Sequence, residues 1–422
     1  MTPSTPRSRS PGLRGTRETR AAITDFPRVT DRRSPLLRGI PEGRCVSSPV
    51  RILFLLTLPL LLALAAPLAA QPIRIGEIEP LTGKEAAFGQ SSHRGVLLAI
   101  DEINARGGVL GRPLQLVTED NQSKPGESAT IAKKLIGRDK VVALIHGGTS
   151  SQTLEVAPFA QNARIPLIAS TATTPQLTTM GTYVFRTCFI DPFQGGVLAK
   201  FAHNSLNARR AALLTSASSP FSVGLARVFR EAFTAAGGTV VGEQRYSEGD
   251  KDFRAQLTAI RGTAPDVIVA MGYYTEGGLI CRQARDLGLT MPILSADGWE
   301  APELIEIGGA AVNGAYYSAH YSSESTAPEV QEFLKKFRAK FDGLTPDSLA
   351  PLAYDAVMIL ADAIERAGTT DGPALRDAIA ATKDFPGVTG RTTIDADRNA
   401  SKPAVIITVK DGHPTYVETV TP

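Results

Sequence analysis

Residues 141–169 read VVALIHGGTSSQTLEVAPFAQNARIPLIA, and this stretch decides the fold class. It opens with an apolar run at 141–145, continues through 152–163 with apolar residues at helical spacing, and closes on a second apolar run at 167–169. Parallel strands need a crossover connection, which is usually a helix. The stretch therefore predicts a strand–helix–strand unit of a parallel sheet.

The same alternation extends along the chain in two successive series. The first series ends near 183–187, where Asp191-Pro192 supplies a helix N-cap and a first-turn proline for the second series. Since one sheet of so many strands would be unusual, we expect an α/β protein with two doubly wound, mostly parallel-sheet lobes. The expected strands span 73–78, 114–118, 141–145, 167–169, 183–187, 211–215, 239–246, 266–271, 292–295, 313–318, 391–394, 404–409 and 415–419. The expected helices span 91–106, 126–138, 152–163, 193–207, 221–236, 252–261, 275–287, 328–341, 349–367 and 372–381.

The net charge of +3 over 422 residues is unevenly distributed. The first 70 residues hold eleven arginines and four acidic residues, so residues 71–422 carry −4. Segment 1–49 is rich in Arg, Pro, Ser and Thr without hydrophobic periodicity, and we expect it to be disordered. The alternative is a mis-assigned extension, with Val50 as the true start.

Residues 50–70 have the features of an export signal. The uncharged run ILFLLTLPLLLALAAPLAA at 52–70 follows Arg51 and ends in small residues. We therefore expect a signal peptide cut after Ala70. An uncleaved membrane anchor is the alternative, because nineteen apolar residues are long enough to span a bilayer.

Several enzyme signatures are missing from the sequence. It has no G-x-x-x-x-G-K-[ST] phosphate loop, no G-x-G-x-x-G after the first strand and no G-x-S-x-G nucleophile turn. The five histidines are dispersed, so no metal or other cofactor is expected, and no basic aromatic patch indicates nucleic acid. Cys188 and Cys281 could form one disulfide, although a small buried hydrophobe explains Cys281 equally simply.

Small hydroxylated residues follow two expected strands at their carboxyl ends. HGGTSS at 146–151 precedes a helix, and ASTATTP at 169–175 follows the next strand. Ligands bind at this end of parallel strands, and free N–H groups at a helix N-terminus attract an anion. Ser150 could add a hydroxyl donor, or Ser150 or Ser151 could simply cap the helix.

Two further strands end in the expected second lobe. GYYTE at 272–276 places Tyr273 where it could close over a ligand, and ADGW at 296–299 places Asp297 where it could hold a cation. A tight turn is the alternative reading of Asp297-Gly298. A carboxylate-binding lobe facing an acidic residue would fit a zwitterion.

At these residues the chain resembles the periplasmic leucine/isoleucine/valine-binding proteins, which are the branched-chain amino-acid receptors of bacterial ABC importers. The similarity runs from about Ile73 to Val409 and consists of separated motifs in the family order. These motifs are IGEIEPLTGKEAAFGQ at 75–90, AIDEINARGGVLGRPLQLV at 99–117, IASTATTPQLT at 168–178, FRTCFIDPFQG at 185–195, KDFRAQL at 251–257, GYYTEGGLICRQARDLGL at 272–289 and LAYDAV at 352–357.

The resemblance implies a type I periplasmic-binding fold whose chain crosses between two lobes three times. We expect the crossings near 191, 318 and 389. Lobe one would then comprise 71–191 plus 319–389, and lobe two 192–318 plus 390–422.

The resemblance also implies roles for individual residues. Ser150 would bind the carboxylate of an amino acid, Thr173 both ends of the zwitterion, and Thr171 the ammonium through its carbonyl. Tyr273 would close the cleft from lobe two, and Asp297 would pair with the ammonium in place of a longer family glutamate. The expected site also includes Gly148, Thr149, Gly298, Phe88 and Phe221. Phe88 and Phe221 occupy positions where the family has tyrosine, and Leu349 occupies one where the family has an aromatic residue. Thr149 occupies the position of a cysteine that forms a disulfide in the family.

The expected function is that of a non-enzymatic, monomeric receptor in the periplasm that delivers a branched-chain or other hydrophobic amino acid to an ABC permease. One alternative is a receptor for an amide, urea or aromatic acid, for which Asp297 would accept amide N–H groups. Another is an extracellular ligand-sensing domain, which an uncleaved anchor at 52–70 would favour.

Overall fold

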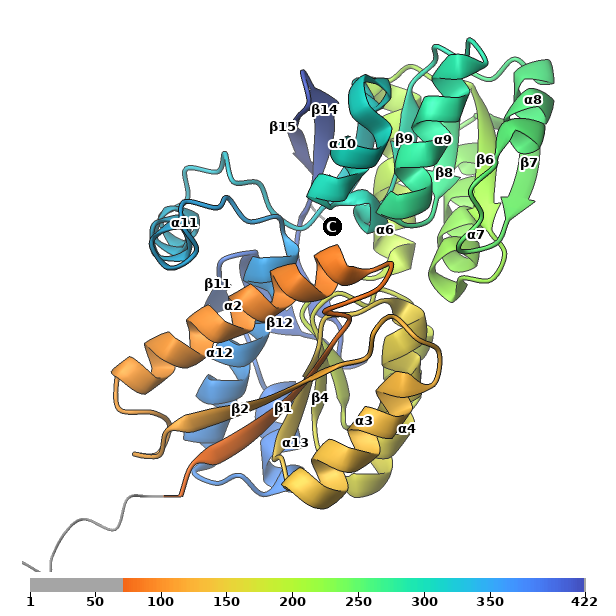
Figure 1. The fold of residues 1–422 in the computed structure, drawn as a ribbon. Helices are drawn as coiled ribbons and strands as arrows, with labels where there is room; N and C mark the ends of the chain where they lie inside the picture. The colour runs from red at the N-terminus through yellow and green to blue at the C-terminus, as the bar shows by residue number, and fades with distance from the viewer. Residues whose placement is uncertain (1–70, 421–422) are drawn as a thin grey trace, which may run out of the picture. The chain divides into compact units, whose positions relative to one another are not determined.

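The computed structural model describes residues 71–420, which form two α/β lobes (Figure 1). The expectations for 1–49 and 50–70 lie outside the described residues. None of the helices described is both long and apolar enough to cross a membrane. The two-lobed α/β fold expected from the strand and helix alternation is confirmed.

Lobe one contains a five-stranded parallel sheet of order β2-β1-β3-β4-β5. Its apolar strands are buried on both faces, as parallel strands covered by helices must be. Its strands are β1 (Ile73–Glu79), β2 (Leu114–Asp120), β3 (Ala143–His146), β4 (Leu167–Ala169) and β5 (Val184–Arg186). Its helices are α2 (Ala86–Ala105), α3 (Glu127–Lys134), α4 (Ser150–Ala163), the short α5 (Gln176–Thr179), α11 (Pro328–Lys340), α12 (Leu349–Ala367) and α13 (Gly372–Ala380).

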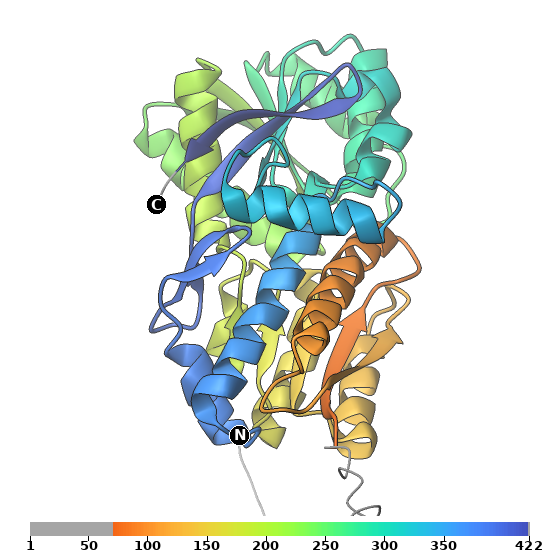
Figure 2. The same cartoon turned by 90° about the vertical axis from the view of Figure 1, so that its left-hand side faces the viewer.

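The helices of lobe one cover both faces of this sheet. Side chains of α2, α12 and α13 form one apolar layer with the strands, and side chains of α3 and α4 form the other. Figure 2 shows α2 and α12 side by side with α11 running across them. Val330, Phe333 and Phe337 of α11 pack there against Leu98 and Ala350.

Lobe two contains a seven-stranded sheet of order β15-β14-β10-β9-β8-β6-β7. Five strands are parallel, and the antiparallel hairpin β14–β15 adds an edge. The strands are β6 (Arg210–Ser216), β7 (Thr239–Tyr246), β8 (Val267–Met271), β9 (Ile293–Ser295), β10 (Ala315–Ala319), β14 (Ala404–Lys410) and β15 (His413–Val420). The helices are α6 (Asp191–Lys200), α7 (Pro220–Ala235), α8 (Arg254–Gly262), α9 (Tyr274–Asp286) and α10 (Pro302–Gly308).

A third, small sheet follows the expected crossing near 389. Strands β11 (Phe385–Gly387), β12 (Gly390–Ile394) and β13 (Ala400–Ser401) form a small antiparallel sheet. Ile394 and Ala400 of this sheet are buried in the core of lobe one. Part of the segment expected in lobe two thus packs on lobe one, and the next strand of the lobe-two sheet, β14, begins at Ala404.

Two smaller differences concern helix ends. Helix α2 begins at Ala86, five residues before the expected start, so Phe88 lies in its first turn. The helices expected to reach 138 and 207 end in single π-helical turns, Leu135–Asp139 and Phe201–Ser205. Cys188 and Cys281 are both buried and free, so the disulfide does not form.

Candidate functional site

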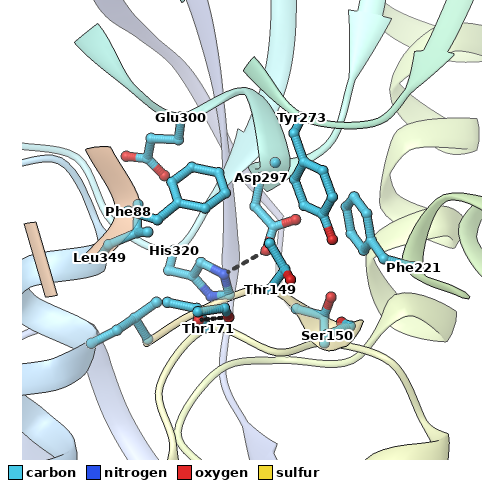
Figure 3. A pocket seen from close by; sticks show the side chains of 14 residues that line it. Phe88, Thr149, Ser150, Thr171, Phe221, Tyr273, Asp297, Glu300, His320 and Leu349 are labelled. Carbon is cyan, nitrogen blue, oxygen red and sulfur yellow. Dashed lines mark hydrogen bonds and ion pairs between the residues drawn. The ribbon is translucent and has the colours of Figure 1, made fainter. Parts of the chain in front are cut away.

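A cavity lies between the two lobes, where the carboxyl ends of both parallel sheets meet (Figure 3). This is the position at which open α/β sheets bind ligands. The structure brings all ten residues expected from the sequence to its wall. The lining consists of Phe88, Gly148, Thr149, Ser150, Thr171, Thr173, Phe221, Tyr273, Asp297, Gly298, Glu300, His320, Leu349 and Leu352.

The β3–α4 turn supplies the wall of lobe one. Thr149 is the N-cap of α4, with its side chain accepting from the N–H of Gln152 at 3.5 Å and the Gln152 side chain accepting from the N–H of Thr149 at 3.1 Å. Ser150 is therefore the first residue of the helix and not its cap. Its hydroxyl faces the cavity beside the free N–H groups of the helix start, which suits an anion.

The loop after β4 is held rigidly behind Thr173. The guanidinium of Arg186, fully buried, donates to the carbonyls of Ala172 and Thr174, each at 2.7 Å. The hydroxyl of Thr171 donates to the carbonyl of Gly148 at 2.7 Å and ties this loop to the β3–α4 turn. The role of Arg186 was not predicted from the sequence, although a charged residue within the apolar strand β5 is unusual and indicates a buried partner.

Lobe two contributes the acidic end of the cavity. Asp297 begins a 3₁₀ turn, Asp297–Trp299, directly after β9. Its Oδ2 lies 3.0 Å from Nε2 of His320, while its buried Oδ1 has no hydrogen-bond partner among the described residues. Burial raises the pKa of Asp297 to about 7. A carboxylate with one unused oxygen in a buried site is suited to an N–H donor from a ligand.

Aromatic and aliphatic side chains form the remaining walls. The rings of Phe221 and Tyr273 stack with centroids 5.4 Å apart, and Phe88 meets Tyr273 edge-on at 6.0 Å. Leu349 and Leu352 come from the first turn of α12. This lining provides an apolar compartment between the hydroxyl-bearing and acidic walls.

Glu300, His320 and Leu352 also line the cavity and were not predicted from the sequence. Glu300 accepts from the N–H of Ser348 at 2.8 Å and is also hydrogen-bonded to the Ser348 hydroxyl, so it joins lobe two to the start of α12 in lobe one. His320 directly follows the carboxyl end of β10. That position was the available signal, since ligands gather at the ends of parallel strands.

Direct contacts also join the two lobes. Lys84 of lobe one forms an ion pair with Glu248 of lobe two at 3.1 Å. The hydroxyl of Tyr274, in lobe two, donates to the carbonyl of Lys84 at 2.8 Å and accepts from the N–H of Ala87 at 3.3 Å. These contacts join the segment 84–87 of lobe one directly to Glu248 and Tyr274 of lobe two.

No cluster of three His, Cys, Asp or Glu side chains that could hold a metal ion occurs within residues 71–420. Burial raises the pKa of both Cys188 and Cys281 to about 12, so neither thiol is poised as a nucleophile. The cavity offers hydrogen bonds and apolar contacts, which are means of binding.

Two lobes closed over a cavity of this kind define a two-lobed solute receptor. The chain belongs to the periplasmic binding protein family, whose family model matches residues 72–414. It is 34% identical over 341 residues to the Leu/Ile/Val-binding protein BraC3 of Rhizobium johnstonii. The match covers 80% of this chain and 92% of BraC3.

Solved structures give the same result. The leucine-binding protein LivK of Thermotoga maritima has 38% identity and a TM-score of 0.79, covering 83% of this chain and 99% of its own. The branched-chain amino-acid transporter substrate-binding protein LivJ of Streptococcus pneumoniae, solved with isoleucine, has 36% identity and a TM-score of 0.79. The match covers 83% of this chain and 100% of LivJ. The family expected from the sequence motifs is confirmed.

Proposed function

We propose that this chain is an extracytoplasmic receptor of an ABC importer and that it binds a branched-chain or similar hydrophobic α-amino acid between its lobes. The observation that carries the proposal is the arrangement of three surfaces around one cavity. A hydroxyl-bearing helix start lies on lobe one, a buried carboxylate on lobe two, and apolar side chains between them.

Each surface matches one part of the ligand. The carboxylate would accept hydrogen bonds from Ser150, Thr173 and the first N–H groups of α4, where the helix dipole favours negative charge. The ammonium would pair with Asp297 and donate to the Thr171 carbonyl. An aliphatic side chain would fill the space beside Phe88, Phe221 and the leucines of α12.

The ligand links the two lobes in this proposal. Its carboxylate contacts lobe one, and its ammonium contacts Thr171 of lobe one and Asp297 of lobe two, so the ammonium gains its oppositely charged partner only when the lobes close. The relatives named above are solute-binding proteins, which supports a receptor without catalytic activity. The receptor would act in the periplasm as a monomer and would dock in its closed form to a membrane permease.

Titration calorimetry of residues 71–422 with leucine, isoleucine and valine tests the proposal. We expect binding of all three, and Asp297→Ala should weaken it by about 3–5 kcal/mol because the ammonium would be buried without a partner. Absence of binding to any amino acid would overturn the ligand class. Binding of an aromatic acid, amide or urea instead would support the alternative receptor class.

A further inference from the structure

Among the described residues, His320 is the only side chain that hydrogen-bonds to the side chain of Asp297, and the backbone N–H groups of Asp297 and Gly298 also stabilise this carboxylate. Nε2 of His320 lies 3.0 Å from Oδ2 of Asp297. The side chain of His320 is 3% exposed and that of Asp297 is 11% exposed. A carboxylate only accepts hydrogen bonds, so we place the imidazole proton on Nε2. The ring then occupies one oxygen of Asp297 and leaves the other for the cavity (Figure 3).

The ring and the backbone of His320 are each held by a neighbouring residue. It stacks on Phe189 with centroids 3.7 Å apart and planes 21° from parallel. Its backbone N–H donates to the hydroxyl of Ser348 at 3.2 Å. Burial and the nearby Lys402 hold the pKa of His320 well below its usual range, so the ring is neutral and donates one proton.

We propose that His320 is a positioning residue that makes the short Asp297 side chain selective for an α-ammonium group. The inference rests on the proposed function. Aspartate has a shorter reach than glutamate and its carboxylate can rotate about the terminal bond. The bond to His320 fixes that rotation with Oδ1, buried and without a partner in residues 71–420, available to one N–H of the ligand.

This role differs from a purely structural one in what it predicts for two related ligands. Leucine carries the ammonium group, whereas 4-methylpentanoate has the same carbon skeleton and carboxylate without it. A residue that orients Asp297 affects only leucine binding. A residue that merely supports the packing around Phe189 affects both ligands together.

The experiment measures the dissociation constants of leucine and 4-methylpentanoate for the wild type, His320→Leu and His320→Gln by calorimetry. The glutamine side chain in His320→Gln can place an amide N–H near the position of Nε2. The leucine side chain in His320→Leu has a similar bulk and no hydrogen-bond donor. We expect His320→Leu to weaken leucine binding by about 10- to 100-fold, the range for a hydrogen bond to a charged group, and to leave 4-methylpentanoate unchanged. His320→Gln should recover most of the discrimination, which is the ratio of the dissociation constant of 4-methylpentanoate to that of leucine.

Three results would overturn the inference: unchanged leucine affinity in His320→Leu, an equal loss for both ligands, or no recovery in His320→Gln. If His320→Leu does not fold, His320→Asn replaces it, because its shorter amide does not reach Asp297. Failure of the wild type to bind any amino acid would instead overturn the proposed function. Wild-type binding with discrimination preserved in His320→Leu would overturn this inference alone.

Discussion

Asp297 couples ligand affinity to pH at the scale of a single residue. Burial raises its pKa to about 7, and only the ionised carboxylate can pair with an ammonium. Leucine affinity should therefore be constant above about pH 8 and fall by about tenfold for each unit below pH 7. Calorimetry between pH 5 and pH 8 measures this profile, and an affinity that stays constant down to pH 5 would contradict it.

A control is needed because Asp191, whose pKa burial raises to about 8, titrates in the same range. The variant Asp297→Asn removes the titrating carboxyl group at position 297 and retains that of Asp191. Its leucine affinity should be lower than that of the wild type and nearly independent of pH. A wild-type slope that persists in Asp297→Asn would assign the titration to Asp191.

Gly298 matters at the same scale because other parts of the chain pack too closely against it to leave room for a side chain. A Cβ on this residue would stand 2.4 Å from the carbonyl oxygen of Gly272 and 3.1 Å from the ring of Phe221. The backbone contact cannot relax cheaply, so Gly298→Ala should cost about 1–3 kcal/mol of stability and weaken leucine binding by at least about tenfold.

Gly196→Ala is the matched control for this substitution. Gly196 lies inside α6, and a Cβ there would meet nothing within 4 Å. The change should therefore stabilise the helix by about 0.5–1 kcal/mol and leave ligand affinity unchanged. Urea unfolding and calorimetry of both variants check the pair; wild-type affinity in Gly298→Ala would remove the steric argument.

At the scale of elements, the start of α9 forms a latch between the lobes. The Tyr274 hydroxyl bonds to two backbone groups of lobe one, and its ring meets Phe88 edge-on at 5.0 Å. Tyr274→Phe keeps the ring and removes both hydrogen bonds. We expect leucine to dissociate about tenfold faster, since each bond contributes about 0.5–1.5 kcal/mol to the closed state.

Tyr321→Phe controls for loss of a buried tyrosine hydroxyl as such. Its hydroxyl donates to the carbonyl of Pro346 at 2.7 Å, and both residues belong to the lobe-one segment between the second crossing and α12. This variant should lower stability without changing the dissociation rate. Stopped-flow measurements of both variants separate closure from folding, and equal dissociation rates in the two would show that Tyr274 is no latch.

The alternation of strands and helices could be predicted because each element has its own hydrophobic period. The expected ranges 239–246 and 349–367 coincide with β7 and α12. The small sheet could not be predicted in the same way. Its strands are short, and their place depends on pairing and on burial of Ile394 and Ala400 against α12, which local sequence does not report.

Some residues of the site could likewise be predicted from the sequence, and others could not. Ser150 and Asp297 follow strands that periodicity identifies, so their position at the sheet edge was predictable, and the family motifs suggested their roles. His320 acts through Asp297, 23 positions away in the sequence, and Glu300 through Ser348 in the other lobe. Such partners are set by how the two lobes meet, which has no local sequence pattern.

At the scale of the whole molecule, a ligand that bridges both lobes should stabilise them together. Binding to the folded state alone adds about 2.7 kcal/mol to the free energy of unfolding at a ligand concentration of 100 times the dissociation constant. For the roughly 350 residues described, average unfolding entropies convert this to a rise in Tm of about 3–4 °C. Differential scanning calorimetry with and without leucine measures this rise in Tm. We expect a single unfolding transition that moves to higher temperature when leucine is present.

Asp297→Ala tests whether the stabilisation comes from bridging. If the variant binds leucine at least about 100-fold more weakly, the same leucine concentration is no higher than its dissociation constant and the rise in Tm falls below about 1 °C. Small-angle scattering should show leucine compacting the wild type and leaving the variant unchanged. Leucine that binds the wild type yet shifts the melting of one lobe only would contradict a ligand held by both lobes, because each half of the zwitterion would then have to be satisfied within a single lobe.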